Sequence, residues 1–233
     1  MIFDLFLWPM LIPLAIPLVY CIYYQRKEVF DVLVIIFIMV LIVFFYIPLS
    51  YSFYSDANFY VKMLLFVLLP VFVLFIWSRI RKRIFEEEDI FRWEYFGINT
   101  KGLEKSLKLG IVFLPIMLFT SFIVIYINGQ VIPGSYILGD VYFVESITEE
   151  FFFRGLLFLF LWRFTSLKVA YVTSVSSFVL MHPNNLADVF ILSTIVQGFL
   201  TVEVCRRSKN LLGAWIVHGA NRFFIIVIIA LIL

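Results

Sequence analysis

Residues 149–155 read EEFFFRG, which places Glu149, Glu150 and Arg154 between two apolar runs, VYFV and LLFLFLW. Such runs predict a membrane-spanning helix, because about 20 apolar residues are needed to cross the hydrocarbon core of a bilayer. A charged side chain at the bilayer centre costs at least about 2.5 kcal/mol on insertion scales. We therefore expect these three charges to have partners inside the protein and to serve a function.

The composition of the whole chain indicates the same class of protein. Its 233 residues are 64% hydrophobic and only 15% charged, whereas a soluble domain is about half apolar and a quarter charged. We predict an all-α polytopic membrane protein whose environment is the lipid bilayer, with no nucleic acid as a partner. Cys21 and Cys205 are far apart in apolar surroundings and suggest no disulfide framework.

Eight apolar segments are candidate transmembrane helices. They are 4–24, 32–54, 63–80, 109–128, 141–162, 169–183, 188–205 and 211–233. The first segment has no basic residue before it and no small-residue cleavage pattern after it, so we expect a retained helix and not a signal peptide.

The positive charges predict the orientation of these helices. Alternate loops together carry fifteen Lys and Arg residues, whereas the opposite set of loops carries only Lys62. Basic loops face the cytoplasm. This alternation predicts eight spans with both termini outside and with any site in the second half opening toward the cytoplasm.

The charge distribution also divides the chain. Residues 1–140 would supply the first four spans, with the amphipathic segment 81–108 forming a cytoplasmic interfacial helix or a solvated connector. Residues 141–233 would form the functional core, because almost all ionisable residues inside spans fall there. These are Glu145, Glu149, Glu150, Arg154, His182, Glu203, His218 and Arg222. The first four spans are expected to lack interior charge.

Helical spacing sorts the charges of the fifth span. Glu150 and Arg154 are four residues apart, so they share a helix face and are expected to pair. Glu149 lies about 100° around the helix from Glu150 and needs another partner. Glu145 is on the face of Glu149, and we expect these two carboxylates to share a proton. A carboxylate of this kind is a candidate general base.

The only two histidines are natural partners for Glu149. Glu149 and His182 each lie 14 residues from a basic helix end, so both would be about 21 Å deep. His218 would be slightly shallower, and Asn221 follows it on a shared face. Glu and His can activate water, while His and Asn can stabilise an oxyanion, so the set suits hydrolysis of an amide. For each residue alone, a structural hydrogen bond or ion pair is an equally good interpretation.

Three motifs in order carry a resemblance to a known family. They are EEFFFRG, then FVLMH with Phe178 four residues before His182, then HGANR with His218 and Asn221. Over roughly residues 140–225 the chain resembles the CPBP (Abi) family of membrane-embedded CAAX prenyl proteases, including the Ras-converting type, and of bacteriocin-processing or immunity proteins.

The resemblance implies a glutamate-dependent intramembrane endopeptidase without a cofactor. Glu149 and His182 would activate water, and His218 with Asn221 would stabilise the oxyanion. Glu150, Arg154 and Phe178 would orient the site. The implied substrate is a prenylated protein or peptide C-terminus of the CAAX type, from which the last three residues are released.

The third motif departs from the family pattern. Family members carry Asn four residues after this histidine, whereas here Arg222 holds that position and Asn221 precedes it. A shift of one residue turns a side chain by about 100° around the helix. The oxyanion donor is therefore Asn221, Arg222 or neither.

Other functions remain open for the same residues. Two histidines and a glutamate could hold zinc in a membrane hydrolase, although no HExxH motif is present. A protein of the same fold could bind a peptide without cleaving it, as in bacteriocin immunity. A proton-coupled transporter would also use intramembrane Glu and His, but the chain shows no internal repeat.

Overall fold

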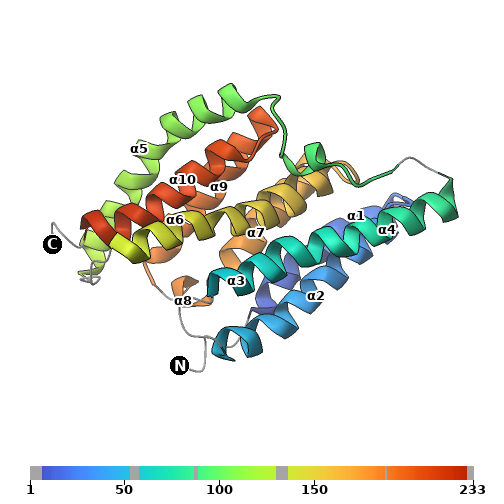
Figure 1. Cartoon of the computed structure of the whole chain (residues 1–233), viewed down its shortest axis with the longest axis horizontal. Coiled ribbons are helices and arrows are strands. Elements are labelled where there is room, and N and C mark those ends of the chain that lie inside the picture. The colour runs from blue at the N-terminus through green and yellow to red at the C-terminus, as the bar shows by residue number, and fades with distance from the viewer. Residues whose placement is uncertain (1–6, 53–57, 87–88, 130–135, 187, 230–233) are drawn as a thin grey trace.

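The computed structural model describes residues 7–52, 58–86, 89–129, 136–186 and 188–229. Within these ranges every regular element is a helix and no strand is present, which confirms the all-α prediction for the described part of the chain. The helices keep their labels in Figure 1, and η marks a 3-10 or π-helical segment.

In the described part of the chain, consecutive segments join into eight helical runs, one for each predicted span. The first four runs are η2 (Trp8–Leu14) with α1 (Ala15–Tyr23), α2 (Val29–Ser52), α3 (Asn58–Lys62) with η4 (Met63–Leu68) and α4 (Leu69–Phe85), and α5 (Leu103–Asn128). The last four are α6 (Tyr136–Glu150) with η6 (Phe151–Phe160), α7 (Leu167–Leu180), α9 (Phe190–Ser208), and α10 (Leu212–Phe223) with η7 (Phe224–Ile229). Two short helices, η5 (Trp93–Phe96) and α8 (Pro183–Leu186), lie between runs.

Three of the described helices are long and apolar enough to cross a membrane: Val29–Tyr46, Phe59–Phe85 and Leu103–Asn128. Shorter apolar helices are Trp8–Tyr23, Leu167–Leu180 and Leu212–Val227. Large apolar side chains face outward from the long helices, as with Phe44 (70% exposed) and Phe119 (68% exposed). Such a surface is stable against lipid and unstable in water. The protein is a multi-pass integral membrane protein.

The helices form two groups around a central pair (Figure 1). Helices α1, α2 and α4 lie on one side, α5, α9 and α10 lie on the other, and the α6 run and α7 pass between them. All ten residues of η6 are buried. A helix that is apolar on every side is expected to be enclosed by others. The residues FFFRG of the EEFFFRG motif therefore lie at the centre of the molecule.

Small residues allow α10 to approach its neighbours closely. A Cβ atom added to Gly213 would overlap the carbonyl oxygen of Ser106 on α5. A Cβ atom on Gly219 would lie 2.8 Å from both the Phe143 ring and Ser146 Oγ on α6. Small residues at crossings are the usual means by which membrane helices pack. Gly219 adjoins His218, so this crossing sets how near the third motif comes to the first.

The described part of 81–108 does not form one helix, which contradicts the interfacial-helix alternative and leaves the connector alternative. Helix α4 ends at Phe85, η5 spans only four residues, and α5 begins at Leu103. Phe96 is fully buried and stacks on Phe160 of η6, with ring centroids 4.8 Å apart. Ile90 and Phe96 of this segment are buried, whereas Trp93 and Ile98 remain about half exposed. The described part of the segment is therefore a connector that packs on the end of the helix bundle only in part.

Buried charges in the first half of the chain lie just outside the predicted spans, at residues that the sequence analysis assigned to loops. Asp31 in the first turn of α2 is buried and lies 3.1 Å from Arg81 Nε of α4. Trp77 Nε1 donates a hydrogen bond of 2.8 Å to the same carboxylate. The partners stand on a neighbouring helix, and the sequence alone does not show which helices are neighbours.

Candidate active site

The last turns of α6 present three buried carboxylates, Glu145, Glu149 and Glu150. The predicted pair of Glu150 and Arg154 is present, with Arg154 Nε 3.3 Å from Glu150 Oε2 and both side chains fully buried. Arg154 Nε also donates a hydrogen bond of 2.7 Å to Thr201 Oγ1. This arginine therefore connects α6–η6 to α9 through its Nε, whereas its two Nη atoms have no hydrogen-bond partner among the described residues.

Phe178 of α7 contacts residues of all three motifs. The guanidinium carbon of Arg154 lies 4.2 Å from the centroid of its ring. The rings of His182 and His218 also contact it, with centroid distances of 4.9 and 5.9 Å. A cation over the face of an aromatic ring is stabilised by the ring quadrupole. Phe178 thus fixes the arginine and brings both histidines to one place.

His218 is held by Glu150 and faces Glu149. Its Nδ1 lies 2.7 Å from Glu150 Oε1, and since an ionised carboxylate only accepts hydrogen bonds, Nδ1 carries a proton. Its Nε2 lies 3.7 Å from Glu149 Oε2, which is beyond hydrogen-bond length. Within the described residues Glu149 Oε2 has no hydrogen-bond partner. The ring thus turns its second nitrogen toward an unsatisfied carboxylate oxygen.

His182 stands just past the end of α7, beside the other motif residues. Its Nδ1 lies 2.9 Å from the carbonyl oxygen of Phe178, which can only accept, so Nδ1 donates. Its Nε2 has no hydrogen-bond partner among the residues whose side chains are described. No hydrogen bond joins His182 to Glu149 among the described residues. Its contact with the site runs through the ring of Phe178.

Glu149 and Glu145 are joined by a cation that sequence reasoning missed. Lys62 Nζ, from the end of α3, lies 2.6 Å from Glu149 Oε1 and also pairs with Glu145 Oε1. Lys62 is only 5% exposed. The prediction that the two carboxylates share a proton is therefore replaced by a shared ammonium group. The first half of the chain thus contributes directly to the site.

Lys62 was assigned to a loop because it follows a polar stretch and is the only positive charge predicted on its side of the membrane. One signal could have identified it. It is flanked by Val61 and Met63 at the start of an apolar run, so a helix that includes it would carry the charge into the membrane. A buried lysine needs a carboxylate partner, and Glu149 lacked one.

Arg222 and Asn221 point to different partners, as their angular separation predicts. Arg222 Nη1 lies 3.3 Å from Glu149 Oε1 and 3.7 Å from Glu145 Oε1. Asn221 Nδ2 donates a hydrogen bond of 3.1 Å to Gln197 Oε1 on α9. The arginine therefore stands beside the carboxylate of the first motif, and the asparagine connects α10 to α9.

In the described part of the site, three carboxylates are matched by three cationic side chains. Three carboxylates of α6 face Lys62, Arg154 and Arg222, each at ion-pair distance from at least one of them. Buried charges are stable only when they are paired in this way. Among the described residues, no three His, Cys, Asp or Glu side chains are grouped as metal ligands.

Three π-helical segments begin beside these residues. Segment η4 follows Lys62 directly, η6 follows Glu150 directly, and η7 starts two residues after Arg222. A π-turn widens the helix, weakens its hydrogen-bond ladder and is frequent at functional sites. In η6, Ser174 Oγ of α7 donates a hydrogen bond of 2.7 Å to the carbonyl oxygen of Phe153. Side chains of neighbouring helices thus support the widened backbone.

Comparison with known families identifies the part of the chain that carries the site. Residues 135–224 match the family model described as Type II CAAX prenyl endopeptidase Rce1-like. This part of the chain is an Rce1-like domain. It contains all three motifs and every site residue named above except Lys62. No curated protein and no solved structure matches the chain.

Proposed function

We propose that the protein is a glutamate-dependent intramembrane endopeptidase in which Glu149 is the general base. The observation that carries the proposal is the 3.7 Å separation of Glu149 Oε2 and His218 Nε2. In the neutral tautomer of His218 that Glu150 favours, both atoms are hydrogen-bond acceptors. A water molecule beside them can donate one O–H to each, which leaves its lone pairs directed outward as a nucleophile.

The chemical step then follows from general base catalysis. Glu149 accepts a proton from the water, and the oxygen attacks the carbonyl carbon of the scissile amide. The same proton is then available for the leaving amine. Glu150 keeps the ring of His218 in one tautomer, and Arg154 in turn fixes Glu150. These two residues are positioning residues in the proposal.

The developing oxyanion needs donors or cations near the attacked carbonyl. We assign this role to Arg222, whose guanidinium stays charged and can donate hydrogen bonds. Arg222 lies at the Glu149 carboxylate, whereas the amide nitrogen of Asn221 is engaged by Gln197. With this assignment, the protein needs no asparagine at the position of Arg222 for activity.

The proposed substrate is the prenylated C-terminus of a CAAX-type protein, from which the last three residues are released. The support is the match of residues 135–224 to the family model described as Type II CAAX prenyl endopeptidase Rce1-like. We further propose that the protein spans the membrane eight times, with both termini outside the cytoplasm. Residues 1–140 would support the core 141–233, and the basic loops would face the cytoplasm, where the substrate approaches.

A second function is favoured by one observation. Glu149 is paired with both Lys62 and Arg222, and two neighbouring cations weaken a carboxylate as a proton acceptor. This arrangement suits a protein that binds a peptide without cleaving it, such as an immunity protein. In the protease, bound substrate would have to draw at least one cation away from Glu149.

Product analysis separates the two functions. Purified protein in detergent is incubated with a farnesylated CAAX peptide and with the same peptide lacking the lipid, and the products are identified by mass spectrometry. The proposal predicts release of the intact C-terminal tripeptide from the farnesylated peptide only. Uncleaved peptide recovered in complex with folded protein would favour the binding function.

A further inference from the structure

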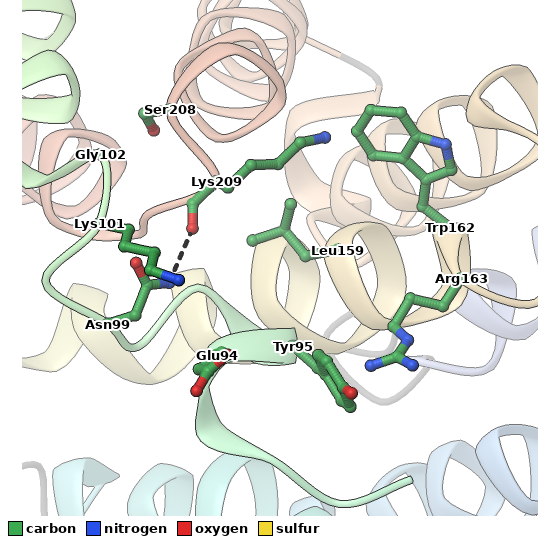
Figure 2. Close-up of a pocket in the computed structure, with 10 residues that line it drawn as sticks. All are labelled: Glu94, Tyr95, Asn99, Lys101, Gly102, Leu159, Trp162, Arg163, Ser208 and Lys209. Atoms are coloured by element: carbon green, nitrogen blue, oxygen red, sulfur yellow. Dashed lines mark hydrogen bonds between the residues drawn. The ribbon is translucent and has the colours of Figure 1, made fainter.

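A cavity of about 530 Å³ opens where the ends of several helices meet, and it shares no lining residue with the candidate active site. Figure 2 shows Lys209 and Trp162 on one side of it, Arg163 and Tyr95 on the other, and Leu159 between them. The walls come from η5, the end of the α6 run and the end of α9. Residues far apart in the sequence therefore build one cavity.

The lining carries three cations and one carboxylate, so its net charge is positive. Lys101, Arg163 and Lys209 line the cavity, while Glu94 is the single carboxylate among its lining residues. None of the three cations forms an ion pair with a residue that the structure describes. Each therefore remains able to meet the negative charge of a ligand.

Aromatic rings hold two of these cations in place. The guanidinium carbon of Arg163 lies 3.0 Å from the centroid of the Tyr95 ring. Lys209 Nζ lies 3.1 Å from the centroid of the Trp162 ring. A ring face orders a cation without neutralising it. The cations are thus positioned before a ligand arrives, which lowers the entropy cost of binding.

The backbone that carries Lys101 is fastened to the end of α9. Asn99 Nδ2 donates a hydrogen bond of 3.1 Å to the carbonyl oxygen of Lys209, and Asn210 Nδ2 donates one of 2.6 Å to the carbonyl oxygen of Asn99. Gly102 has a φ of +74°, and a Cβ atom there would overlap the carbonyl oxygen of Ser208. The two cation-bearing turns therefore form a fixed wall.

We propose that this cavity binds the phosphate headgroup of an anionic phospholipid. Trp and Tyr at helix ends mark the headgroup level of a bilayer, and basic pockets between helices at that level suit anionic headgroups. The Leu159 side chain and the Trp162 ring offer apolar contact for the glycerol and the first acyl carbons. A free phosphate would use the cations alone and gain nothing from this apolar part.

The experiment titrates the purified full-length protein in detergent with dihexanoyl phosphatidylglycerol and follows binding by calorimetry. Dihexanoyl phosphatidylcholine and inorganic phosphate are the comparison ligands. We expect saturable binding of phosphatidylglycerol, at least tenfold tighter than of either comparison ligand. Each of Lys101→Gln, Arg163→Gln and Lys209→Gln should weaken it by about fivefold.

Matched controls make the test specific. Lys105 and Lys168 are exposed and lie outside the cavity, so Lys105→Gln with Lys168→Gln should leave the affinity within twofold of wild type. An equal loss in this control variant would show a diffuse surface charge effect and overturn the proposal. Phosphate binding as tightly as the lipid would overturn the lipid assignment. Lys101 is exposed, so its variant remains informative if another fails to fold.

Discussion

Lys62 Nζ lies 2.6 Å from Glu149 Oε1, so the candidate general base is held by a residue of a helix outside the Rce1-like domain. This ion pair connects the run of α3 and α4 to the central α6 run at the site itself. It also means that the first half of the chain does more than enclose the second half. A change in that half can alter the chemistry of Glu149 without touching any motif.

We predict that Lys62→Met strongly destabilises the protein. Removing one partner of a buried ion pair leaves an uncompensated charge and costs about 3–5 kcal/mol. The melting temperature in detergent should fall well below that of Lys168→Met, which removes an exposed lysine. Adding Glu145→Gln to Lys62→Met should restore part of the loss. No difference between the two lysine variants would contradict the burial of this pair.

The Glu150–Arg154 pair is predicted to be structural, and the chain contains a matched control. Glu104 and Lys108 form a pair at the same four-residue spacing, but both side chains are exposed. Glu150→Gln should lower the free energy of unfolding by several kcal/mol, whereas Glu104→Gln should change it by less than about 1 kcal/mol. Equal melting temperatures for the two variants would exclude a buried role for Glu150.

Gly219→Ala is predicted to separate α10 from α6. The added Cβ would lie 2.8 Å from the Phe143 ring and Ser146 Oγ, so the helices must move apart and carry His218 away from Glu149. Peptide cleavage should drop by at least about tenfold. Gly198→Ala is the control, because its Cβ meets its nearest neighbour at an ordinary 3.4 Å. Full activity of Gly219→Ala would show that this close crossing is dispensable.

Lys209 should titrate at an unusually low pH. Partial burial, with the positive charge of Arg206 as the next cause, lowers the pKa of Lys209 to about 8 from its ordinary value of 10.5. The folded protein thus binds fewer protons than the unfolded chain between these values, and its stability gains as the pH rises through this window. Acetylation of Lys209, followed by mass spectrometry, should reach half its maximal rate near pH 8. Lys168 provides the comparison, and identical pH profiles for the two lysines would refute the prediction.

The sequence predicted the helices and motifs well because each depends on local spacing. The pairing of Glu150 with Arg154 and the divergence of Asn221 from Arg222 follow from angles on one helix. The partners of Asp31 and Glu149 could not be predicted in this way. Arg81 and Lys62 stand on other helices, and hydrophobic periodicity does not show which helices are neighbours.

The missed residue shows where sequence reasoning fails. Lys62 was assigned by counting charges in loops, which is a statistical rule about orientation and not about burial. The mixture of charged and apolar residues in 81–108 suggested an interfacial helix for a similar reason. Phe96 packs on the bundle end against Phe160, and tertiary contact of this kind leaves no periodic pattern in the sequence.

The central claim is that Glu149 activates water, and a cleavage assay tests it most directly. Wild type, Glu149→Gln and Glu104→Gln are compared on a fluorogenic farnesylated CAAX peptide in detergent, with and without a metal chelator. Loss of a general base predicts at least a 100-fold lower rate for Glu149→Gln, with unchanged rates for Glu104→Gln and for wild type in chelator. A Glu149→Gln rate within about twofold of wild type, in protein of normal melting temperature, would contradict the account.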